Sequence, residues 1–116
     1  MRAVDRTFGV LLILGGVGHS IGSYLGYQSN QMELLWALCA SLFVFLLGAV
    51  NLLRAGRPND ATVAWICLFG LLGWIPTMIR FAMLNHNPFE IHELIFMVLT
   101  LGLLFFSIRT IRTAHQ

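Results

Sequence analysis

The sequence predicts an all-α integral membrane protein whose four transmembrane helices form an up-down-up-down antiparallel bundle. Hydrophobic residues make up 58% of the 116-residue chain and charged residues only 10%, whereas soluble domains carry about 25% charged residues. The charges also cluster between uncharged runs of roughly the ~20 residues that a transmembrane helix needs. Short polar links between the runs make consecutive helices antiparallel neighbours. A single domain therefore accounts for the whole chain.

The four apolar segments lie at about residues 7–27, 33–53, 62–84 and 89–108. The link at residues 54–60 is the clearest turn, because it contains glycine, proline and asparagine, which interrupt helices. A second polar link covers residues 85–88 and ends at Pro88. Within the third segment, Pro76 is expected to interrupt or kink the helix.

The arginines predict the orientation of the chain, because cytoplasmic loops of membrane proteins are enriched in basic residues. If the chain crosses four times, only Arg80 belongs to the outer end. We therefore expect a multi-pass protein of a bacterial-type inner (plasma) membrane, with both termini in the cytoplasm. The other six basic residues all fall at the cytoplasmic end: Arg2, Arg6, Arg54, Arg57, Arg109 and Arg112.

Small residues fill the second half of the first segment, where leucine and valine are usual. Gly18, Gly22 and Gly26 repeat every four residues, and Gly15 lies one turn before His19. Small residues at this spacing let membrane helices approach closely. The sequence therefore predicts that the other segments pack against these four glycines, and that His19 lies in or beside the packing surface.

Helical periodicity indicates which faces of the later segments point inward. On the second segment, one stripe comprises Glu33, Ala37, Ala40, Val44, Leu47 and Asn51. On the third segment, a stripe of small and polar residues runs from Gly70 through Thr77 to Arg80, flanked by Trp74. We expect both stripes to face the interior of the bundle.

Each segment carries one ionisable group near its outer end, and such groups usually face the bundle interior and pair. At a rise of ~1.5 Å per residue, His19 lies ~12 Å from the outer link, and Arg80 and Glu93 lie ~6–8 Å from it. These positions predict an outward-facing polar pocket with His19 at its base. The alternatives are an Arg80–Glu93 structural ion pair and a histidine hydrogen-bonded to another helix. The candidate ligand or proton site comprises His19, Glu33, Trp74, Arg80, His92 and Glu93.

Three classes of function remain open, and the sequence does not decide whether the protein is an enzyme. In the first, the pocket binds or transports a small ligand, proton or ion. The second is a haem or quinone redox module, with His19 and His92 as the only pair of candidate ligands for haem b. A small membrane enzyme is a variant of this class, with His19 as base and Arg80 holding an anionic group of a lipid-phase substrate. The third is an accessory or structural subunit.

The expected partners are the lipid bilayer and either a second copy of the chain or another membrane subunit. A formal net charge of +2 is too small to indicate a nucleic-acid partner. The sequence also lacks the His-Glu-x-x-His and Cys-x-x-Cys patterns of zinc and thiol redox sites, so it predicts no metal site.

Overall fold

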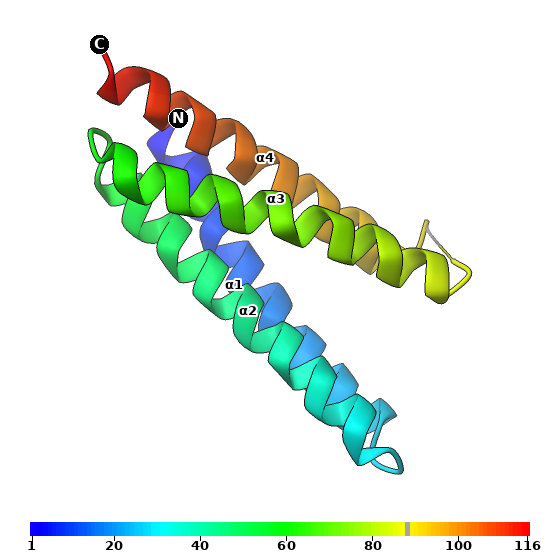
Figure 1. Ribbon diagram of the computed structural model, residues 1–116. Helices are drawn as coiled ribbons and strands as arrows, with labels where there is room; N and C mark the ends of the chain where they lie inside the picture. Colours follow the sequence, from blue (N-terminus) through cyan, green and yellow to red (C-terminus); the bar gives the residue numbers. More distant parts are fainter. Residues whose placement is uncertain (88) are drawn as a thin grey trace.

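A computed structural model describes residues 1–87 and 89–116, which fold as four helices (Figure 1). They are α1 (Arg2–Gly26), α2 (Gln31–Gly56), α3 (Ala61–Leu84) and α4 (Ile91–Ala114). Each helix is long and apolar enough to cross a membrane. The predicted all-helical fold with four apolar helices is therefore confirmed. Pro88, placed at the end of a polar link by the sequence, lies outside the described residues.

Three helices extend further than the apolar segments at their arginine-bearing ends. The first begins at Arg2, the second continues past Arg54 to Gly56, and the fourth ends at Ala114. Arginine is a good helix former, so the helices continue where the apolar run stops. The third helix runs through Pro76 without a break. Neighbouring helices and local adjustment accommodate such prolines in membrane helices.

Side-chain caps fix the starts of the second and third helices. The Asn30 side chain accepts a hydrogen bond from the Glu33 backbone N at 3.2 Å, and that of Asp60 accepts one from the Val63 backbone N at 3.1 Å. Such caps satisfy backbone N–H groups that have no partner within the helix. Each cap ends a short link, so the chain turns back directly after α1 and after α2.

Figure 1 shows the helices as two hairpins, α1 with α2 and α3 with α4. The hairpins meet at the end that holds both termini and the α2–α3 link, and they diverge toward the other two links. All four helices contribute to the buried apolar cluster between them. Its members are Leu12, Val44, Leu47, Leu71 and Leu103.

Glycines allow the close approach of α1 and α2 near the cluster. A Cβ atom added at Gly48 would lie 2.6 Å from Ile13 Cγ1 and 3.2 Å from the Gly9 carbonyl oxygen. Real Cβ atoms essentially never lie within 3.0 Å of such an atom, so a side chain at Gly48 would force its neighbours to move. Gly48 therefore has a packing role that the sequence did not single out.

The predicted packing surface on α1 is only partly present. A Cβ at Gly15 would lie 2.9 Å from the Phe96 ring on α4, so this glycine does contact another helix. A Cβ at Gly18, Gly22 or Gly26 would meet nothing within 4 Å. These three glycines lie on the part of α1 that follows its contact with α4. Within one chain, the other segments do not pack against them.

The glycines give a matched pair of substitutions. We expect Gly48→Val to lower the free energy of unfolding by about 1–3 kcal/mol, because its added atoms overpack the α1–α2 contact. Gly22→Val introduces the same side chain at a helical site with open space, so it has little effect on the monomer. Titration with a denaturing detergent in mixed micelles measures both. Equal destabilisation by the two variants would contradict the packing described here.

Candidate functional site

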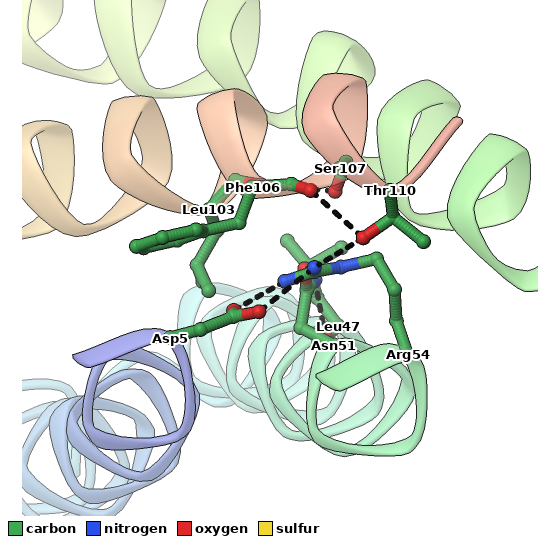
Figure 2. Close-up of polar contacts among 8 residues, drawn as sticks. All are labelled: Asp5, Leu47, Asn51, Arg54, Leu103, Phe106, Ser107 and Thr110. Atoms are coloured by element: carbon green, nitrogen blue, oxygen red, sulfur yellow. Dashed lines mark hydrogen bonds and ion pairs between the residues drawn. The ribbon is translucent and has the colours of Figure 1, made fainter. Parts of the chain in front are cut away.

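A buried ion pair joins α1 to α2 at the end of the molecule that holds the termini (Figure 2). Arg54 Nη1 donates to Asp5 Oδ2 at 3.0 Å, and Nη2 donates to Asp5 Oδ1 at 2.5 Å. Arg54 is 1% exposed and Asp5 is 7% exposed. Two parallel hydrogen bonds between a guanidinium and a carboxylate form one of the stronger side-chain contacts in proteins.

Neutral polar groups complete the environment of the Arg54 guanidinium. Its Nη1 also donates to Thr110 Oγ1 on α4 at 3.2 Å, and its Nε lies 3.4 Å from Asn51 Oδ1. Asn51 in turn donates to the Leu47 carbonyl at 2.8 Å. Side chains from α1, α2 and α4 therefore meet around Arg54.

The network connects the two hairpins. A charge taken out of water costs several kcal/mol unless a partner and further hydrogen bonds compensate it. Here Asp5 compensates the charge of Arg54, and Thr110 brings the second hairpin to the same group. Asp5 and Arg54 are occupied with each other, so their main contribution is to hold α1, α2 and α4 in register.

A cavity of about 230 Å³ opens beside this network. Three arginines and one aspartate line it, so its wall is basic. Because Asp5 is already paired with Arg54, the other two lining arginines, Arg2 and Arg109, lack that counter-charge. The residues that matter for its chemistry are Arg2, Asp5, Arg54, Phe106, Arg109 and Thr110.

Sequence reasoning missed this site because it assigned Arg54 to an exposed link. A signal was present in the spacing of polar residues. Asn51 and Arg54 lie three residues apart on one helical face, as do Ser107 and Thr110, and such pairs share a face. Asp5 is also the one acid among the arginines that precede the first apolar run.

His19 is hydrogen-bonded to another helix, which is one of the alternatives that the sequence left open. Its Nδ1 lies 2.8 Å from Ser41 Oγ on α2. Ser41 Oγ also lies 3.2 Å from the Ala37 carbonyl oxygen and has one proton to donate. Both contacts are hydrogen bonds only if Ser41 donates to the carbonyl and accepts from His19, so we assign the neutral tautomer with the proton on Nδ1. In that tautomer the half-buried ring carries its lone pair on Nε2.

The remaining charged candidates lie at or near the surface. Glu33 and Arg80 are exposed, and Glu93 is half-buried. His92 is exposed, and its Nδ1 lies 3.3 Å from Oε1 of the neighbouring Glu90. Among the ion pairs of residues 1–87 and 89–116, there is none between Arg80 and Glu93.

The candidates are divided between the two hairpins. His19 and Glu33 belong to the first, and the other four belong to the second. Apart from Trp74, which lies in the middle of α3, the candidates lie toward the ends that diverge in Figure 1. The structure therefore does not gather the six residues into one pocket within a chain, and it does not bring His19 and His92 together as a haem-ligand pair.

Trp74 is the candidate with an unsatisfied polar atom. Its ring packs on Phe43, with ring centroids 5.5 Å apart, and against the buried apolar cluster. Within the described part of the chain, its buried Nε1 has no hydrogen-bond partner. A buried donor without a partner costs free energy, so Trp74 stays a candidate donor to a ligand.

The four candidate spans suggest a multi-pass membrane protein. Comparisons with protein-family models, curated proteins and solved structures found no match. The chemistry of the side chains is therefore the basis for assigning a function.

The contribution of the ion pair to stability can be tested directly. Asp5→Asn removes the counter-charge of the buried Arg54, so we expect the free energy of unfolding to fall by about 3–5 kcal/mol. Asp60→Asn is the matched control, because Asp60 pairs with the exposed Arg57 at 3.7 Å. Asparagine also caps a helix as well as aspartate, so this control costs about 0–1 kcal/mol. Detergent titration of both variants checks the difference, and an unchanged Asp5→Asn protein contradicts it.

Proposed function

We propose that the four helices cross a bacterial-type inner membrane in an up-down-up-down arrangement, with both termini in the cytoplasm. The distribution of arginines supports this orientation. Six of the seven basic residues lie at the end that holds the termini and the α2–α3 link, and basic residues favour the cytoplasmic side. His19 then lies in the outer half of the protein.

In this orientation, we propose that the protein binds a lipid-phase ligand bearing a hydroxyl group, with His19 as the recognising residue. The hydrogen bond between His19 Nδ1 and Ser41 Oγ, at 2.8 Å, carries the proposal. It fixes the ring and leaves Nε2 as an acceptor. Within a membrane, few groups compete for such an acceptor, because the hydrocarbon region holds almost no water.

The surroundings of His19 favour a ligand with an apolar body. Leu38 lies one turn before Ser41 on α2 and is an exposed apolar residue, and Gly22, three residues after His19, leaves open space beside α1. A hydrocarbon chain fits such a surface, and its hydroxyl group reaches Nε2. The same lone pair accepts a proton, which makes His19 a base or a proton carrier if the ligand reacts or moves.

Paired probes test this proposal. We expect dioctanoylglycerol, which has one free hydroxyl, to bind the purified protein at least about tenfold more tightly than trioctanoylglycerol in calorimetric titrations, since an unsatisfied buried acceptor is costly. Decylhydroquinone and its dimethyl ether form a second pair. His19→Ala removes the preference for the hydroxyl form, whereas His86→Ala, at an exposed histidine, retains it.

A protein that binds both members of each pair equally, before and after His19→Ala, contradicts the role of Nε2. Thermal unfolding of the same variants separates binding from folding. If His19→Ala lowers stability and leaves the binding preference intact, the histidine serves only to join α1 to α2.

The open glycine face of α1 supports a second candidate function, as an accessory subunit or a self-associating protein. Gly18, Gly22 and Gly26 meet no other helix of the same chain, and small residues at this spacing favour helix association in membranes. The partner in this case is a second copy or another membrane subunit.

Gly22→Val tests this second function, because the substitution fills the face without touching the rest of the monomer. We expect it to weaken self-association in lipid vesicles by about tenfold, or ~1.4 kcal/mol. Energy transfer between labelled copies measures the change. Gly56→Val, another glycine with open space, is the control, and an equal effect of both variants contradicts a specific interface at Gly22.

A further inference from the structure

We propose that the basic cavity beside the Asp5–Arg54 pair binds a phosphate group, with Arg2 and Arg109 as the binding residues. Arg54 acts as a positioning residue. This inference is independent of the ligand proposed for His19, because the cavity lies at the opposite end of the helices.

The lining of the cavity carries an excess of positive charge. Three arginines and one aspartate line it, and Asp5 is paired with Arg54. Arg2 and Arg109 are exposed, and neither takes part in an ion pair among the described residues. Two guanidinium groups therefore border the same cavity without a counter-charge, which favours an anion over a neutral or cationic ligand.

The buried network also links the two helices that carry Arg2 and Arg109. Arg2 lies three residues before Asp5 on α1, and Arg109 directly precedes Thr110 on α4. The Arg54 guanidinium bonds both Asp5 and Thr110, so the buried network sets the distance between the two helices. The cavity is thereby preorganised by contacts that do not depend on a ligand.

The chemistry of the donors identifies the ligand class. Guanidinium groups match the geometry of phosphate oxygens and bind them through paired hydrogen bonds. At about 230 Å³, the cavity is smaller than the ~300–1,000 Å³ of sites for drug-sized ligands, which suits a single phosphate group. The hydroxyls of Thr110 and Thr113 contribute little to phosphate binding, because both already donate their proton to backbone carbonyls.

Two sources supply this chemistry at the end of a membrane helix bundle: the headgroup of an anionic phospholipid and a free phosphate ion. The test therefore uses two probes. Phosphatidylglycerol retention is measured by native mass spectrometry of the full chain, and binding of inorganic phosphate is measured by calorimetry in a zwitterionic detergent without phosphate groups.

The variant is Arg2→Gln with Arg109→Gln. The matched control is Arg6→Gln with Arg112→Gln, which removes the same charge from exposed positions of the same two helices outside the cavity lining. Both double variants remove two basic residues from the same end, so any effect on orientation is the same in both. We expect the first double variant to bind the probe at least about tenfold more weakly, because it loses two charge-assisted contacts, and the control to change less than about twofold.

If the first double variant loses phosphatidylglycerol, the control retains it, and neither binds inorganic phosphate, the proposal is supported and the phosphate group belongs to a lipid. If inorganic phosphate binds and only the first double variant weakens this binding, the proposal is supported and the ligand is a soluble anion. Absence of both overturns the proposal. Equal losses in the two double variants also overturn it, because attraction to the general basic surface then accounts for the binding. Thermal unfolding of each variant confirms that the compared proteins are folded.

Discussion

The arrangement of the helices depends on one buried interaction, the ion pair between Asp5 and Arg54. Neither charge is tolerable alone at 7% and 1% exposure, so the two residues must meet for the termini end of the protein to pack. Their meeting joins the first helix to the second, and the Thr110 hydroxyl adds the fourth. Direction matters here as well as strength, since the paired hydrogen bonds permit one relative position of guanidinium and carboxylate.

The rest of the packing follows from this fixed end. The buried leucines and Val44 lie between the hairpins. Within the first hairpin, Gly48 lets α2 approach α1 closely at Ile13. Farther along, no ion pair or side-chain hydrogen bond among residues 1–87 and 89–116 joins the hairpins, and they diverge (Figure 1). His19 and Ser41 then join only α1 to α2. A buried polar network thus holds one end of the protein together, and at the other end the two hairpins are separate.

Much of the fold was predictable because hydropathy depends on local composition. Uninterrupted apolar runs predicted four helices, and periodicity correctly assigned Val44, Leu47 and Asn51 to a buried face. The stripe on the third helix was only partly correct. A Cβ at Gly70 would lie 2.9 Å from Leu47, and Trp74 packs against the buried cluster. Thr77 and Arg80, however, are exposed, and the buried residues of this helix include Cys67, Leu71 and Met78. On that helix nearly every position is apolar, so periodicity carries little information about which face points inward.

The buried network was beyond local reasoning for a different reason. Arg54 follows an apolar run and precedes a turn, which is the usual place of an exposed arginine. Its partner lies 49 residues away in the sequence, and only the packing of the hairpins brings the two together. The polar groups that sequence reasoning emphasised lie on ends that diverge. Of those groups, His19 has a defined partner on another helix, and it carries the proposed function.

Nitrogen-resolved NMR of the arginine side chains in micelles tests the central claim most directly. The account predicts separate, slowly exchanging Nη proton signals for Arg54, because its guanidinium is held by Asp5 and shielded from water. The exposed Arg6 provides the internal reference, with signals averaged by rotation and exchange. An Arg54 guanidinium that rotates and exchanges with water as freely as that of Arg6 contradicts the account.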